Sequence, residues 1–353
     1  MNTLPTRVLK IDPTSPDPAV IHEAAALIRA GQLVAFPTET VYGLGANALD
    51  ALAVDRIYQA KGRPATDPVI VHVQAAQQVA ELTTHIPDVA RALIDAFWPG
   101  PLTLVLSRGP RVPPNVSAGL PTVAIRMPAH PVALALITAA GVPVAAPSAN
   151  LFAHPSPTTA QHVLHDLDGK IALILDAGPT QVGVESTILD ISANHPRLLR
   201  PGGVSLDTLR RIVPEVEVVT RYVRADEGAV PAPGMLLKHY SPRAELRLFD
   251  GPDEAVRVAL SQAAAELTRQ GFHVGLLVAD EDRAALSLPG VSLVSLGSLG
   301  DLSQVAQRLF AGLRDLDARG VDVILARAYP PAGIGMAIQD RLIRAAQGRV
   351  TYV

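Results

Sequence analysis

The sequence predicts an α/β protein of two domains: an N-terminal α+β domain with a twisted, mixed sheet, and a small C-terminal parallel α/β domain of Rossmann-like type. Up to residue 212, helix and strand patterns mix without strict alternation, which favours an α+β arrangement. From residue 244, apolar strands alternate regularly with amphipathic helices, as in a parallel sheet. With 353 residues, 48% of them hydrophobic, the chain can build two cores.

The N-terminal domain is predicted to span residues 1–212. Residues 18–30 have the pattern of an amphipathic helix that ends before Gly31, because glycine readily adopts the left-handed conformation that closes a helix. The next run, 33–45, is predicted to begin as a strand and to end in a glycine turn. Further helices are expected at 50–60, 87–97 and 130–140, and further strands at 69–73, 101–107, 121–128, 171–175 and 187–191.

Residues 213–243 form a predicted linker, since the run around AVPAPGMLLKHYSPRAE leaves little room for regular structure. Because this run also carries apolar and aromatic side chains such as Met235 and Tyr240, we expect it to dock on another part of the protein rather than to be a plain spacer. The C-terminal domain, 244–353, is expected to contain strands at 247–250, 273–279, 291–296 and 322–328, and helices near 252–270, 300–318 and 334–347.

Composition excludes several classes of function. The formal charge is −3, and residues 1–212 carry 15 Lys+Arg against 16 Asp+Glu, so stable nucleic-acid binding is not expected. The chain has no cysteine, which excludes thiolate catalysis, cysteine zinc sites and iron–sulfur clusters. No signal-peptide pattern or apolar run near the ~18 residues of a membrane span is present. These features predict a cytoplasmic protein without a membrane segment.

The segment PTETVYGLG, residues 37–45, offers hydroxyl groups for a polar ligand. In a strand, alternate side chains share a face, so Thr38, Thr40 and Tyr42 are expected on one side. The alternative is an ordinary strand, because threonine and tyrosine favour strands. A dinucleotide-binding glycine loop is a weak reading, since the glycine spacing is imperfect.

The loop KGRPATDP, residues 61–68, brings two cations together. Arg63 can bind phosphate oxygens with its planar fork, and Lys61 can act as a compact charge. The alternative is a solvated helix end, where cations are favoured in any case. Lysine is scarce in this chain, with four residues at positions 10, 61, 170 and 238, which tips the interpretation toward a functional Lys61.

Two further strands carry polar residues among apolar ones. His72 lies between valines, where a structural histidine is the more common interpretation. Arg126 shares a strand face with Thr122 and requires a partner, because burying an unpaired charge is costly. That partner could be a glutamate or a substrate carboxylate. The segments PSAN (147–150) and ESTI (185–188) add hydroxyls that could equally be turns or caps.

Familiar nucleotide and hydrolase motifs are absent. The sequence has no P-loop, HExxH, GxSxG or kinase catalytic loop. Its histidines lack metal-ligand spacing backed by carboxylates, so no metal site from protein side chains is expected. The residues themselves therefore predict a polar, cationic pocket for a small anionic substrate.

Taken together, PTETVYGLG, KGRP with DPVIVHV, TVAIRMP, APSAN, ESTILD and LLRPGG resemble the YrdC-type threonylcarbamoyl-adenylate synthase family. PGMLLKHYSP and a C-terminal α/β domain ending in GIGMAIQDRLIRAA resemble its longer, two-domain form. The resemblance implies a YrdC-like catalytic domain at 1–212 and a linker at 213–243 that closes over the active site. It also implies a nucleotidyltransferase that joins L-threonine, bicarbonate and ATP into threonylcarbamoyl-AMP, releases pyrophosphate and supplies a tRNA modification.

The resemblance also implies site residues. Lys61 and Arg63 form the family's KxR pair, which we expect to act in catalysis. Threonine binding is implied for Thr40, His72, Arg126 and Ser186. ATP binding is implied for Arg63, Asp67, Thr122, Ala146, Ser148, Ser156, Arg200 and Tyr240. Many relatives have Asn where this chain has Asp67, and an ionised carboxylate at this position cannot donate the hydrogen bonds that an amide can.

The implied chemistry needs no protein nucleophile, because a carbamate formed from threonine and bicarbonate attacks the α-phosphate itself. Mg²⁺ is expected to arrive with ATP, with no organic cofactor, and a separate transferase would pass the product to tRNA. The main alternative is an RNA-binding module without catalysis, which the neutral charge and the 4% aromatic content disfavour. A carbamoyl-transferring relative with cysteine-rich zinc motifs is excluded by the lack of cysteine.

Overall fold

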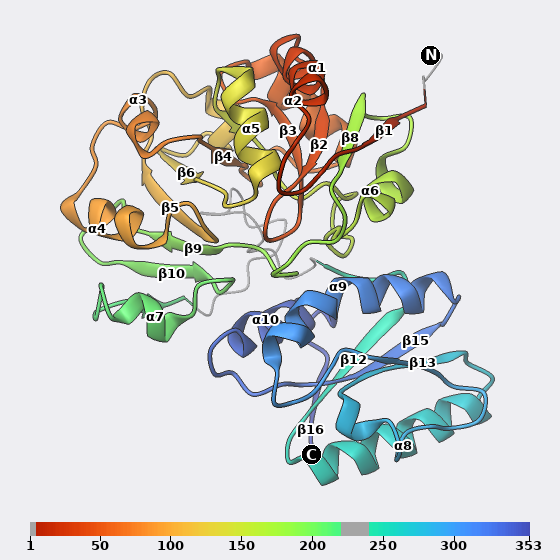
Figure 1. Ribbon diagram of the computed structural model, residues 1–353. Helices are drawn as coiled ribbons and strands as arrows, with labels where there is room; N and C mark the ends of the chain where they lie inside the picture. The colour runs from red at the N-terminus through yellow and green to blue at the C-terminus, as the bar shows by residue number, and fades with distance from the viewer. Residues whose placement is uncertain (1–4, 220–239) are drawn as a thin grey trace. The chain divides into compact units, whose positions relative to one another are not determined.

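A computed structural model describes residues 5–219 and 240–353 (Figure 1). The described residues form two compact units. The first unit takes residues up to Phe152 and from Ser156 to Val219, and the second takes Ala153–Pro155 and the chain from Tyr240 onward. Within these ranges, no helix combines the length and apolarity that crossing a bilayer requires.

The first unit is built on a mixed sheet, as the sequence predicts. The strand order is β1-β8-β2-β3-β7-β4-β6-β5-β9-β10-β11. The sheet contains parallel pairs such as β4/β6 and β5/β9 and antiparallel pairs such as β2/β3 and β5/β6. The strands are β1 (Arg7–Lys10), β2 (Val34–Pro37), β3 (Tyr42–Asn47), β4 (Ile70–His72), β5 (Leu102–Ser107), β6 (Thr122–Arg126), β7 (Val144–Ala145), β8 (Leu173–Asp176), β9 (Thr187–Asp190), β10 (Arg197–Arg200) and β11 (Glu217–Val218).

Helices cover this sheet and complete its core. They are α1 (Pro18–Arg29), α2 (Ala51–Lys61), α3 (Val79–Leu82), α4 (Asp88–Phe97), α5 (Pro131–Ala140), α6 (Ala160–Leu167) and α7 (Leu206–Arg210). Helices α1 and α5 lie side by side (Figure 1), and apolar residues such as Ile28 and Leu136 pack with Phe36 of β2 in one buried cluster. Such burial of an apolar helix stripe against a sheet is the main stabilising contribution to a domain of this kind.

The expectation for residues 37–45 is wrong in one respect. Thr38 and Thr40 do not continue a strand, because the chain turns between β2 and β3, which pair antiparallel. The Thr38 hydroxyl donates to the Val41 carbonyl at 2.6 Å and accepts from the Thr40 amide at 3.2 Å. A threonine side chain can hold a turn in this way, and the alternating pattern conceals it.

The second unit is a parallel α/β domain, which confirms the sequence prediction. Five parallel strands have the order β14-β13-β15-β12-β16. They are β12 (Glu245–Asp250), β13 (Val274–Val278), β14 (Ser292–Ser295), β15 (Val323–Arg327) and β16 (Val350–Tyr352). Helix α8 (Asp253–Arg269) covers one face, and α9 (Leu302–Ala318) and α10 (Gly335–Ala345) cover the other (Figure 1).

Candidate active site

The first polar group of the N-terminal unit centres on Arg126, the last residue of β6. Its Nη1 donates to the Thr40 hydroxyl at 3.0 Å, and its Nε donates to the Gly100 carbonyl at 3.2 Å. Its Nη2 lies 2.6 Å from Glu39 Oε1 in a buried ion pair. Of the two partners the sequence left open for this arginine, the structure therefore supplies a glutamate.

Glu39 is the residue that the sequence interpretation missed. Its second carboxylate oxygen accepts from the Ala129 amide at 3.1 Å, so the glutamate is anchored as well as paired. A guanidinium carries five N–H donors on three nitrogens. Here each nitrogen has one partner: Gly100, Thr40 or Glu39. Arg126 is thus held in one orientation and still has donors for a further anion.

His72 lies next to Arg126 because β4 and β6 run parallel with His72 opposite Arg126. Its Nδ1 lies 3.3 Å from the Ile70 carbonyl, and its ring meets Phe36 edge to face. Burial, together with the neighbouring Arg126 guanidinium, lowers the pKa of His72 to about 3. At neutral pH the ring is therefore uncharged, so it can exchange hydrogen bonds with a ligand but adds no charge.

The lowered pKa of His72 predicts a pH-dependent stability. The imidazole titrates near 6.5 when unfolded and near 3 when folded, so the unfolded chain takes up this proton first as the pH falls. The contribution of the neutral His72 ring to the free energy of unfolding is fully present above pH 6.5. It is lost toward pH 3, by up to about 1.4 kcal/mol per pH unit. We expect His72→Gln to flatten this slope.

This slope can be measured by urea unfolding at a series of pH values. The single tryptophan, Trp98, lies in the same unit as His72, so its fluorescence reports the unfolding of that unit. His195→Gln, at an exposed position, is the matched control and should keep the wild-type slope. An unchanged slope in His72→Gln would show that this histidine is not held neutral.

The second polar group contains the two cations of the loop after α2. Helix α2 ends at Lys61, and Gly62 follows in the left-handed conformation. Both Lys61 and Arg63 are buried, with 2% and 7% exposure, so the solvated-helix-end interpretation is wrong. The Lys61 ammonium donates to the carbonyls of Ser148 at 2.6 Å and Asn150 at 2.5 Å.

Arg63 is fixed by its own loop. Its Nε donates to the Asp67 carbonyl at 3.0 Å, and its Nη2 donates to the Pro68 carbonyl at 2.7 Å and lies 2.9 Å from the Asp67 carboxylate. Burial raises the pKa of Asp67, whereas Arg63, Lys61 and Arg200 act to lower it. Three cations therefore act on one buried carboxylate.

Arg200 enters this group from β10. Its Nη2 donates to the Ser186 carbonyl at 2.9 Å and to the Ser186 hydroxyl at 3.2 Å. The same hydroxyl lies 2.8 Å from that of Thr103 on β5. Two candidate residues, Ser186 and Arg200, are thus in contact with each other. Arg200 also acts on Asp67 of the distant KGRPATDP loop.

The segment 182–186 joins the two groups. The amides of Val182 and Gly183 donate to the carbonyls of Glu39 and Thr40 at 2.8 and 3.1 Å. At the other end of the segment, Ser186 holds Arg200. One continuous segment therefore connects the turn beside Arg126 with the cationic group around Asp67.

The other predicted residues are placed as follows. The Ser156 hydroxyl bonds to the Glu185 carboxylate. The Ala146 amide donates to Ile70 at 2.8 Å. Ser148 is engaged through its carbonyl. Thr122 lies opposite Ser107 at the start of β6 and has no side-chain bond among the described residues.

Tyr240 belongs to the second unit. Its ring packs against Phe310 with centroids 5.3 Å apart, and Arg341 lies 5.1 Å above it. The predicted closure of the linker over the site concerns residues 220–239, which lie outside the described part of the chain. Across 5–219 and 240–353, no group of three or more His, Asp or Glu side chains could hold a metal ion.

Comparison with known proteins covers both units. The Sua5/YciO/YrdC family model, described as telomere recombination, matches residues 26–202, and a model described as threonylcarbamoyl-AMP synthase, C-terminal domain, matches 204–347. A threonylcarbamoyl-AMP synthase of Bacillus subtilis (strain 168) is 46% identical over 340 residues, 96% of each chain. One from Pyrococcus abyssi is 44% identical over 94% of this chain and 96% of its own.

A solved structure agrees with the fold over its full length. The crystal structure of P. abyssi Sua5 complexed with L-threonine superposes with a TM-score of 0.93 at 42% sequence identity. The match covers 99% of this chain and 100% of that one. Both units described above therefore have counterparts in one known protein.

Proposed function

This chain belongs to the Sua5/YciO/YrdC family, and we propose that it condenses L-threonine, bicarbonate and ATP into threonylcarbamoyl-AMP and pyrophosphate. The observation that carries this proposal is the match along both units to enzymes named threonylcarbamoyl-AMP synthase. A relative that covers the whole chain was crystallised with L-threonine. The site residues supply the physical reasons that follow.

Threonine binds at the first polar group in this proposal. The carboxylate of the amino acid takes the remaining N–H donors of Arg126, while Glu39 keeps the guanidinium in place. Thr40 and the neutral His72 offer hydrogen bonds to the polar atoms of the substrate. A charged hydrogen bond of this kind contributes about 1.5–3 kcal/mol. Ser186, between the two groups, would complete the threonine site.

The reaction proceeds in two balanced steps. The threonine amine attacks bicarbonate, a C–N bond forms, and water leaves to give a carbamate. A carbamate oxygen then attacks the α-phosphorus of ATP in line, and the bond to the β-phosphate oxygen breaks to release pyrophosphate. The carbamate is the nucleophile, so the protein acts by alignment and by charge stabilisation.

The polyphosphate of ATP binds at the second polar group in this proposal. Lys61, Arg63 and Arg200 all act on the buried carboxylate of Asp67, so three cations are gathered where an anionic ligand could bind. In a site shielded from water these charges act more strongly on phosphoryl oxygens than they would in solvent. Mg²⁺ would arrive bound to ATP and neutralise the β- and γ-phosphates. Thr122, Ala146, Ser148, Ser156 and Tyr240 are the further ATP-binding residues proposed.

The product is an activated adenylate that water would hydrolyse. A separate transferase would carry the threonylcarbamoyl group to tRNA, so the enzyme itself needs no lasting contact with RNA. The net charge of −3 is consistent with this, because a negatively charged protein does not favour stable binding to the RNA phosphates.

The test is pyrophosphate release from ATP with threonine and bicarbonate omitted in turn. We expect release only when both co-substrates are present, and we expect no tight, salt-sensitive tRNA binding in a gel shift without ATP. Release that is indifferent to threonine would contradict the proposed substrate. Tight tRNA binding without any turnover would favour an RNA-binding module instead.

A further inference from the structure

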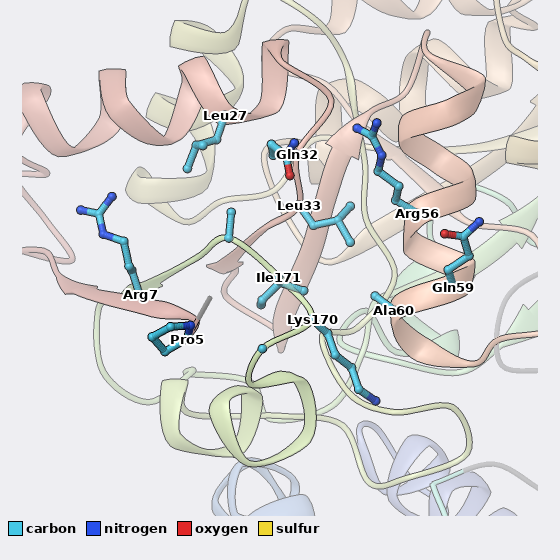
Figure 2. Close-up of a pocket in the computed structure, with 12 residues that line it drawn as sticks. Pro5, Arg7, Leu27, Gln32, Leu33, Arg56, Gln59, Ala60, Lys170 and Ile171 are labelled. Atoms are coloured by element: carbon cyan, nitrogen blue, oxygen red, sulfur yellow. The ribbon is translucent and has the colours of Figure 1, made fainter. Parts of the chain in front are cut away.

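A cavity in the N-terminal unit is lined by none of the predicted site residues. It has a volume of about 650 Å³ and lies where the amino ends of the parallel strands β1, β8 and β2 meet the last turn of α2. Its lining residues are Pro5, Arg7, Leu27, Gln32, Leu33, Arg56, Gln59, Ala60, Gly169, Lys170, Ile171 and Ala172 (Figure 2).

This cavity is separate from the candidate active site. Gln32 and Leu33 precede β2, whereas Thr38 and Thr40 follow it, so the two sites lie at opposite ends of one strand. Helix α2 runs between them: Arg56, Gln59 and Ala60 line the cavity, and Lys61, the next residue, points its ammonium into the second polar group. A molecule bound in the cavity would therefore touch the helix that carries Lys61.

The charges around the cavity favour an anion. Arg7, Arg56 and Lys170 line it, and no acidic residue does. Arg7 pairs with Glu23, and Arg56 donates to the Gly31 carbonyl. Among the described residues the Lys170 side chain makes no ion pair or hydrogen bond, and its exposed ammonium is available to a ligand. Arg7 is thus matched by Glu23, whereas Arg56 and Lys170 form no ion pair among the described residues, and such cations raise the local concentration of small anions.

The apolar base of the cavity and its glutamine side chains favour a planar ligand with polar groups along its edge. Leu33 and Ile171 are buried beneath it, at 4% and 6% exposure. Figure 2 shows Arg7 and Arg56 on opposite sides, with Gln32 and Leu33 between them. Gln32 and Gln59 each present an amide donor and acceptor, and neither amide is bonded to the described protein. An apolar floor with a few convergent polar groups is the usual form of a small-molecule site.

We propose that this cavity binds a nucleoside phosphate: the ring lies over Leu33 and Ile171, the glutamine amides bond the edge of the base, and Arg56 and Lys170, whose charged ends point to different edges of the cavity (Figure 2), attract the phosphate. This site is additional to the one proposed for ATP, and its existence does not depend on the proposed reaction. It needs no covalent step and no metal.

The test counts binding sites by equilibrium dialysis with radiolabelled AMP and no threonine. We expect the wild-type protein to bind one equivalent more than the double variant Arg56→Ala/Lys170→Ala. The control double variant Lys10→Ala/Arg91→Ala removes the same charges at exposed positions outside this cavity and should match the wild type. Pyrophosphate release should be retained in both double variants.

The wild type should bind one equivalent of AMP more than Arg56→Ala/Lys170→Ala whether or not the active site also binds AMP. Failure of this inference is therefore distinguishable from failure of the proposed function. Equal stoichiometry in wild type and Arg56→Ala/Lys170→Ala would overturn the inference. Inorganic phosphate should displace the extra AMP at least tenfold less effectively than unlabelled AMP. Equal displacement would show that the site recognises phosphate alone, and would overturn the assignment of a nucleoside.

Discussion

Replacing Lys61 with methionine is expected to lower the rate of pyrophosphate release by about a hundredfold or more, the cost typical of removing one preorganised charge from a transition state. Methionine keeps most of the side-chain length and removes the ammonium. That ammonium is buried at 2% exposure and acts on Asp67 together with Arg63 and Arg200. Without it, one of the three cations proposed to stabilise the developing pyrophosphate is lost.

Lys61→Met also removes the donor to the carbonyls of Ser148 and Asn150, so its folding must be checked beside its activity. Trp98 fluorescence during urea unfolding measures the stability of the N-terminal unit. Lys10→Met, at an exposed position, is the control. If Lys61→Met remains folded and its rate falls by less than about threefold, Lys61 contributes no charge to the reaction.

Replacing Arg126 with methionine is expected to raise the KM for threonine by one to two orders of magnitude, with a smaller effect on the KM for ATP. The reason is the loss of a charged hydrogen bond to the substrate carboxylate, about 1.5–3 kcal/mol. The same change leaves the buried Glu39 carboxylate without its partner, and breaking such a pair costs about 3–5 kcal/mol of folding stability.

A double variant separates these two effects. In Arg126→Met/Glu39→Gln the unpaired charge is gone, so stability should recover toward the wild type while the threonine KM stays high. Glu39→Gln alone keeps the Arg126 charge and should raise the threonine KM less than Arg126→Met does. Recovery of threonine affinity in the double variant would mean that Arg126 acts on folding only and does not meet the substrate.

Regular elements with a clear apolar period were predictable from the sequence. Helix α1, expected at 18–30, spans Pro18–Arg29 and ends where Gly31 predicts, and the strands of the C-terminal unit form the expected parallel sheet. The short elements β10, β11 and α6 were not predicted, because a few residues carry too little periodic signal.

The sequence names candidate site residues but does not show the network of contacts between them. Motif resemblance brought Thr40, His72 and Arg126 together, and the structure places them in contact or in register. It did not reveal Glu39, because nothing in PTET distinguishes a buried ion pair from an exposed glutamate. The burial of Lys61 was likewise unreadable, since its ammonium binds carbonyls at 148 and 150 that tertiary folding brings near.

In the proposed function, this one protein joins threonine, bicarbonate and ATP into a single adenylate. The most direct measurement is chromatography of the nucleotide products after reaction with ¹⁴C-bicarbonate and ³H-threonine, alongside pyrophosphate quantification. We predict one new nucleotide that carries both labels in equal amounts and matches the pyrophosphate released. Pyrophosphate release with a nucleotide that lacks either label would contradict the account.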